Sequence, residues 1–148
     1  MAVFRSRLFA VGAAVGFLLL APLPGCGSSG SASDAAVERT LLRGVAEIRS
    51  SQNGKSLRGK LVRTLGRIRH ERGSTAAGRK GRELAIQGFA WTVKGLDSQL
   101  AILRNDSGRL EGAVRDAKKA DRHLNRGATL LRAAGRAFGV RIGILNGH

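Results

Sequence analysis

The chain has 148 residues and a net charge of +16, and it is 43% hydrophobic but only 4% aromatic. This length allows one domain, and the hydrophobic content excludes a chain that is disordered throughout. The charge favours anionic partners such as nucleic acid, lipid headgroups or acidic envelope polymers, although abundant Arg, Ala and Gly with few lysines are also what a GC-rich genome produces.

An export signal is predicted at the N-terminus. Arg5 and Arg7 form a short basic segment, and residues 8–21 form an apolar or small-residue run of the length found in signal-peptide cores. That run is shorter than the roughly 20 residues that a membrane span needs. We therefore expect residues 1–25 to direct export and to be removed.

The residues that follow are Leu23-Pro24-Gly25-Cys26. This run resembles the lipobox of bacterial lipoproteins, in which an apolar residue stands three positions before the modified cysteine and a small residue stands just before it. The resemblance covers residues 1–26 only and implies cleavage between Gly25 and Cys26, with lipid on Cys26. The protein would then be anchored on the outer side of the cell membrane, or to the outer membrane facing the periplasm where a second membrane exists.

A plain secretory signal with an incidental cysteine is the alternative. Two features weigh against it, because Cys26 is the only cysteine and has no disulfide partner, and because residues 27–33 are Gly, Ser and Ala only, as in a flexible tether. We thus expect residues 26–33 to be the lipidated cysteine with its tether, and residues 34–148 to be a basic helical domain.

Four helices are expected in that domain, separated by very short turns. The first begins near the caps Ser33 and Asp34 and ends before Asn53; the second begins at the cap Ser56 and ends at Arg72. Their apolar residues recur at helical spacing: Val37, Leu41, Val45 and Ile48, then Leu57, Leu61, Leu65 and Ile68.

The third helix is expected from Ser74 to Arg104, about 45 Å long, and the fourth from an Asp106-Ser107 cap to Phe138. The fourth has one broad stripe: Leu110, Ala113, Val114, Ala117, Leu124, Ala128, Leu131 and Phe138. The tail after Phe138 alternates as a strand would, but no second strand is available to pair with it, so helix or packed coil is favoured. Short turns make sequential helices antiparallel. The predicted fold class is all-α, an up-down antiparallel bundle of about four helices with the last two long.

The third helix carries two apolar seams on well-separated sides. The first seam is Ile86, Phe89, Val93, Leu96, Leu100 and Leu103; the second is Gly81, Leu84, Gly88, Trp91, Gly95, Ser98 and Ile102. Each interior glycine costs about 1 kcal/mol relative to Ala, which close approach of another backbone would offset. Either this helix is the centre of the bundle, buried on both sides, or Leu84, Gly88, Trp91 and Gly95 form a docking seam for a partner or a second copy. We expect the central position, with Trp91 buried inside the monomer.

No catalytic or cofactor pattern is recognisable. The histidines His70, His123 and His148 have no metal-motif spacing, and Cys26 is assigned to the anchor. Residues 54–56 match only the end of a phosphate-binding loop, and nucleophile elbows are missing. We expect no enzyme activity, no cofactor and no bound metal.

One basic stripe stands out in the second helix. Lys60, Arg63 and Arg67 share a side away from the leucines, which is typical either of an anionic-surface patch or of an ordinary solvated face. An exported protein has little access to nucleic acid, and no aromatic residue is interleaved with these arginines. The expected function is a membrane-anchored, non-enzymatic envelope lipoprotein that binds a protein partner or anionic lipid or polymer. A homo-oligomeric structural bundle is the second hypothesis, and a nucleic-acid-binding protein is the third.

Overall fold

The computed structural model describes residues 31–104 and 110–143, and their secondary structure is entirely α-helical. The helices are α1 (Ala32–Ser50), α2 (Gly54–His70), α3 (Ala76–Arg104) and α4 (Leu110–Ala137). Both prolines of the chain precede residue 31, so none interrupts a helix. The prediction of an all-α, up-down antiparallel bundle with two long final helices is confirmed.

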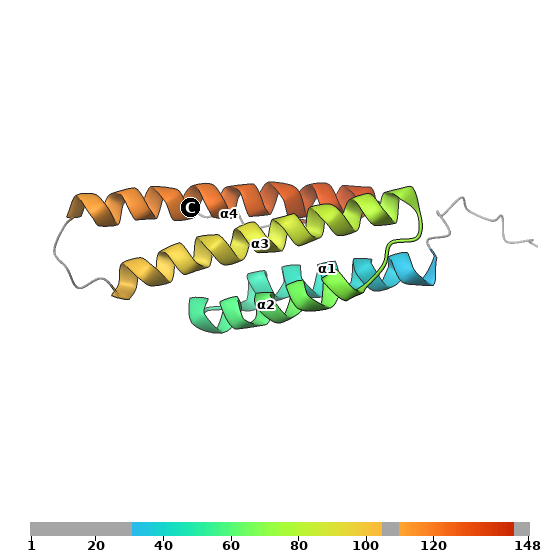
Figure 1. Ribbon diagram of the computed structural model, residues 1–148, viewed down its shortest axis with the longest axis horizontal. Coiled ribbons are helices and arrows are strands. Elements are labelled where there is room, and N and C mark those ends of the chain that lie inside the picture. Colours follow the sequence, from blue (N-terminus) through green and yellow to red (C-terminus); the bar gives the residue numbers. More distant parts are fainter. Residues whose placement is uncertain (1–30, 105–109, 144–148) are drawn as a thin grey trace, which may run out of the picture.

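The bundle consists of two antiparallel helix pairs of unequal length (Figure 1). The long α3–α4 pair forms one layer, and the shorter α1–α2 pair lies against it, mostly beneath α3. Helix α3 contacts all three other helices, whereas α2 contacts α1 and α3 but no described residue of α4. The α3–α4 pair extends past α2 at the end where α3 finishes.

The core lies between the two layers. It joins the apolar stripes of α1 and α2 to Phe89, the largest side chain among those fully buried, and to Leu131 of α4. The predicted stripes of α1 and α2 are confirmed, with Ile48 at the margin of the core. Each apolar residue removed from water there stabilises the fold by roughly 25 cal/mol per Å² of apolar area.

Three residues that we expected to lie inward are exposed, and one of them is Ala117 of α4. Leu103, the last residue of the first α3 seam, is 82% exposed, and Val114 of α4 is 46% exposed. Leu103 continues the seam of Phe89 and Leu96, but the α1–α2 pair is too short to cover it (Figure 1).

The caps of α1 and α2 differ from the prediction. Ser31 caps α1 by accepting a hydrogen bond from the Asp34 amide (3.3 Å), and Asn53 caps α2 by accepting one from the Ser56 amide (3.0 Å). Asn and Ser side chains satisfy the amides that a first helical turn leaves free. Asp34 and Ser56 therefore lie inside their helices, and the expected cap of α4 lies outside the described residues.

Asp34 of α1 holds the two residues that precede α3, and the second of them, Thr75, caps α3 by accepting a hydrogen bond from the Gly78 amide (2.9 Å). The buried carboxylate of Asp34 accepts hydrogen bonds from the amide of Ser74 (2.7 Å) and from the amide (3.3 Å) and hydroxyl (2.5 Å) of Thr75. The Thr75 hydroxyl bond is the main cause that lowers the pKa of Asp34 below its ordinary value, against the opposing effect of burial. A Cβ at Gly78 would collide with this carboxylate, so the contact requires glycine there.

Residues 138–143, which follow α4, form a packed coil. Gly139 adopts a positive φ of 73°, and the amide of Val140 bonds back to the carbonyl of Gly135 (2.8 Å). This arrangement satisfies carbonyls at the helix end, and glycine adopts it without strain. Ile142 then folds back to be buried against Gly135.

Candidate functional site

The glycine-containing seam of α3 packs against α4. These glycines are seven residues apart, and each receives a large side chain from α4 or, at Phe138, from the residue directly after α4, in reverse order. The pairs are Gly81 with Phe138, Gly88 with Leu131, and Gly95 with Leu124. Gly127 of α4 also allows close approach, because a Cβ there would lie 2.9 Å from the Gly88 carbonyl oxygen. The two backbones therefore approach closely along the seam, as small residues permit.

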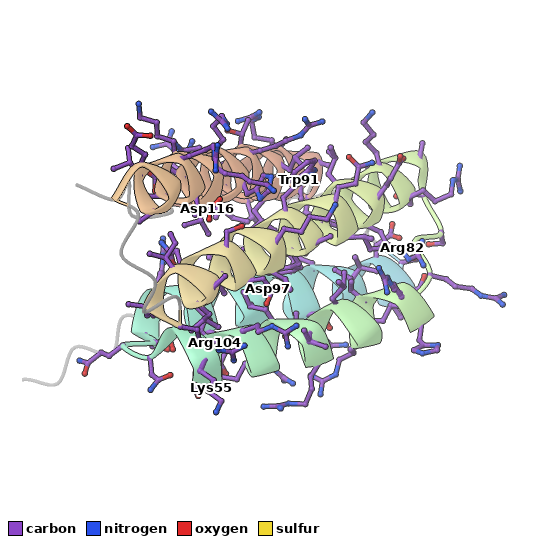
Figure 2. The ribbon with its side chains drawn as sticks, turned by 60° about the vertical axis from the view of Figure 1, so that its left-hand side comes forward. Lys55, Arg82, Trp91, Asp97, Arg104 and Asp116 are labelled. Carbon is purple, nitrogen blue, oxygen red and sulfur yellow. The ribbon has the colours of Figure 1, made fainter. Side chains whose placement is uncertain are left out.

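Within the predicted docking seam, Gly88 and Gly95 are buried under α4, and Leu84 and Trp91 are half-buried. Trp91 lies at the junction of α3 and α4 and is not enclosed, unlike the fully buried Phe89 (Figure 2). The part of the seam that carries the glycines is thus occupied by another helix of the same chain.

The predicted basic stripe of α2 divides into two parts. Lys60 is half-buried and donates a hydrogen bond to Glu47 of α1 at 2.7 Å, whereas Arg63 and Arg67 are exposed. Arg58, on another side of α2, pairs with Asp97 of α3, and this partner raises the pKa of the Arg58 guanidinium. Neither Arg63 nor Arg67 belongs to an ion pair between described residues.

Several polar contacts tie the helices together at one end of the bundle. Arg82 of α3 donates to the carbonyls of Ile68 (3.1 Å) and Arg69 (2.7 Å) in the last turn of α2. A guanidinium at a helix C-terminus satisfies free carbonyls and is favoured by the helix dipole. Ser33, at the start of α1, lies 3.0 Å from the Ser74 hydroxyl before α3. The end of α2 is thus held beside the residues at which the chain enters the domain.

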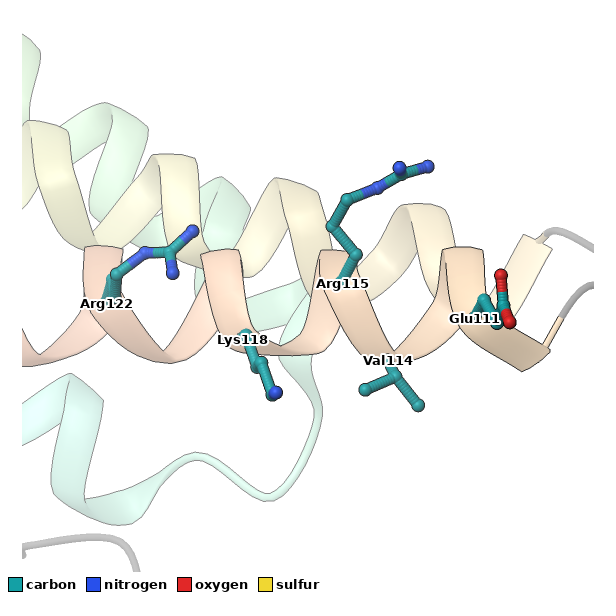
Figure 3. A pocket seen from close by; sticks show the side chains of 5 residues that line it. All are labelled: Glu111, Val114, Arg115, Lys118 and Arg122. Carbon is teal, nitrogen blue, oxygen red and sulfur yellow. The ribbon is translucent and has the colours of Figure 1, made fainter.

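A second basic surface, which the sequence analysis did not identify, lies on α4. A hollow of about 440 Å³ lies there, and the described residues that line it all belong to α4 (Figure 3). They are Glu111, Val114, Arg115, Lys118 and Arg122. Their helical spacing is visible in the sequence, but the basic stripe that the sequence analysis singled out is on α2. A further hollow of about 550 Å³ at the end of α4 is lined by Arg132, Arg136 and Arg141, together with Gly139, Val140 and Ile142.

Two cations lie over the ring system of Trp91. Lys94 of α3 places its Nζ 4.8 Å from the centroid of the Trp91 ring system, and Arg126 of α4 places its Cζ 4.5 Å from it. The ring of His123 lies 5.0 Å from the indole at a tilt of 52°. Sequence spacing brings Lys94 within reach of Trp91, but the contribution of α4 depends on how the two helices align.

Gly25 and Cys26, the predicted cleavage and lipidation residues, lie outside the described residues. Within residues 31–104 and 110–143, no helix is long and apolar enough to cross a membrane. The same residues contain no cluster of three or more His, Cys, Asp or Glu side chains suited to a metal ion.

Comparison with known proteins assigns no family. No protein-family model matches the chain, and no significant match was found among the curated proteins or the solved structures. A functional conclusion therefore depends on this chain's own residues.

Proposed function

We propose that the protein is a lipoprotein of the bacterial envelope, anchored through Cys26, whose non-enzymatic helical domain rests on an anionic membrane surface through α2. The observation that carries this proposal is the exposed basic side of α2, which lies at the end of the domain nearest the anchor sequence.

The charge of α2 supports the proposal. Every charged residue of this helix is basic, and neighbouring helices neutralise only Arg58 and Lys60. The exposed side chains of Arg63 and Arg67 are left to interact with anions. Basic residues close to an anionic leaflet gain about 1 kcal/mol each.

The position of α2 supports it as well. Cys26 is five residues before Ser31, so an extended chain spans at most about 18 Å between them. The hydroxyls of Ser31 and Ser33 contact that of Ser74, beside the end of α2. A lipid on Cys26 would thus hold the Arg67 end of α2 near the bilayer, and the bundle would lie flat to bring Arg63 to the same surface.

The two other hypotheses have less support. The homo-oligomeric bundle was based on the docking seam, and α4 of the same chain covers Gly88 and Gly95. Proteins that bind single-stranded nucleic acid commonly stack bases on aromatic side chains, and α2 has no Phe, Tyr or Trp.

The anchor is tested by replacing Cys26 with serine. We expect wild-type protein to incorporate radiolabelled palmitate and to fractionate with membranes, because acyl chains on Cys26 insert into the bilayer. The Cys26→Ser protein should remain unlabelled and appear as an unprocessed or soluble product. Membrane fractionation of the variant at its mature size would show that the anchoring proposal is wrong.

The role of α2 is tested with the unlipidated chain from residue 26 onward, carrying Cys26→Ser, in co-sedimentation with anionic vesicles. Replacing Arg63 and Arg67 together with glutamine should weaken binding about 30-fold at low salt. Wild-type binding should itself fall as salt increases, because the attraction is screened. The matched control is Arg115→Gln with Arg122→Gln on α4, which removes the same charge from another helix. Equal loss in both double variants would show that net charge, and not α2, determines binding.

A further inference from the structure

The junction of α3 and α4 holds two cations over one aromatic ring system. Lys94 belongs to the same helix as Trp91, one turn further on, whereas Arg126 comes from α4. Both lie within 5 Å of the indole centroid, which is the distance range of cation–π attraction. The ammonium and the guanidinium therefore lie within 10 Å of each other, beside the same indole.

No described carboxylate neutralises this pair of cations. The ion pairs between described residues are Arg58 with Asp97 and Lys60 with Glu47, and neither includes Lys94 or Arg126. Two like charges held near each other repel, and the exposure of both residues reduces that repulsion without removing it. An anion that contacts both side chains would replace this repulsion with two attractions.

The same place contains a second feature that costs stability. The Nδ1 atom of His123, whose ring packs on the indole, is buried with no hydrogen-bond partner in the described chain. Buried polar atoms without partners are uncommon and call for an explanation. Departures of this kind are expected at functional or strained sites.

We propose that Lys94 and Arg126, held over Trp91, form a binding site for a phosphate group. The planar guanidinium presents parallel N–H donors that match two phosphate oxygens, and the lysine ammonium adds a compact charge. The oxygens of one phosphate group, whether a monoester or a diester, can accept hydrogen bonds from both cations at the same time. The half-buried indole keeps water from one side, which strengthens the charge interactions.

The site is separate from the α2 surface. Helix α2 contacts no described residue of α4, and Trp91 lies on the far side of α3 from Lys55 of α2 (Figure 2). The phosphate proposal therefore does not rest on the membrane proposal, and either can fail alone. The phosphate could belong to an envelope phosphodiester polymer or to a lipid headgroup.

Trp91 is the only tryptophan of the chain and reports binding directly. The purified protein, with or without lipid on Cys26, is mixed with uncharged phosphatidylcholine vesicles, and its emission is followed while inorganic phosphate is added at millimolar concentrations. We expect a saturable change in emission that sodium chloride and sodium acetate at equal ionic strength do not reproduce. Glycerol-phosphate polymer and phosphatidylglycerol vesicles, added separately, then identify the source, because the polymer or the headgroup should compete with free phosphate.

Substitutions of Lys94 and Arg126, compared with substitutions on α2, test whether these two residues bind the phosphate. Lys94→Gln and Arg126→Gln should each weaken phosphate binding about tenfold or more, because each removes a charge-assisted contact. Both residues are exposed, so the fold should be retained, and circular dichroism verifies this. Lys55→Gln with Arg63→Gln on α2 removes more charge elsewhere and should leave phosphate affinity unchanged. A response equal to that of chloride or acetate, or equal loss in the α2 variant, would overturn the proposal.

Discussion

Gly127→Leu is expected to lower the free energy of unfolding by about 3 kcal/mol, at the upper end of the usual cost of overpacking a core. A Cβ at this position would lie 2.9 Å from the Gly88 carbonyl oxygen and 3.0 Å from the Thr92 amide nitrogen, and it would also collide with the Thr92 hydroxyl. Two of these atoms are backbone, so they cannot move aside as a flexible side chain would. The α3 and α4 backbones must separate, and Leu131 loses its fit over Gly88. Urea unfolding followed by circular dichroism measures the change.

Gly66→Leu is the matched control for this experiment. Gly66 also lies inside a helix, α2, but a Cβ there meets nothing within 4 Å. Leucine favours the helix over glycine by close to 1 kcal/mol, so this substitution should leave stability unchanged or raise it slightly. If Gly127→Leu instead unfolded at the wild-type urea concentration, the close packing of α3 on α4 would be wrong.

The helices could be predicted from the sequence because their signals are local. The apolar stripes from Val37 to Val45 and from Leu57 to Ile68 follow helical spacing, and both stripes are buried in the structure. Helix limits were less accurate, since Ser31, Ser33 and Asp34 are all suitable caps and only the packing decides among them. Asp34 is the informative case. Its carboxylate accepts hydrogen bonds from the amides of Ser74 and Thr75, forty or more residues later, and local spacing carries no information about such a contact.

The limits of the apolar seams could not be derived from spacing either. Leu103 has the correct period for the core, but its exposure depends on where the α1–α2 pair ends in space. The charged stripe of α2 could also be predicted only in part. Helical spacing groups Lys60 with Arg63 and Arg67, but it does not show that Lys60 pairs with Glu47 of α1. Charge pairing between helices requires knowledge of their alignment.

The surroundings of Trp91 could be predicted in part from local sequence spacing, and the rest depends on how α3 and α4 align. The glycines around Trp91 predicted close contact with another helix, and α4 supplies that contact at Gly88 and Gly95. The indole itself, however, lies at the edge of the contact, where Arg126 and His123 reach it. The α3 glycines, seven residues apart, each face one large side chain of α4 or of the residue directly after it, and this pairing fixes how the two helices align. The alignment is known only when α3 and α4 are placed together.

Phe89→Ala should be more destabilising than Trp91→Ala, although tryptophan is the larger side chain. Phe89 is fully buried, and its ring lies directly over Gly44 of α1, so truncation leaves a cavity between the two layers of the bundle. Such cavities cost about 3–5 kcal/mol for a buried aromatic residue, which is a large part of the stability of a small domain. Trp91 is half-buried at an edge that water reaches, so Trp91→Ala should cost clearly less than Phe89→Ala and leave a cooperative unfolding transition. Thermal and urea unfolding of the two variants measure the order directly. The reverse order would mean that Trp91, and not Phe89, is the centre of the core.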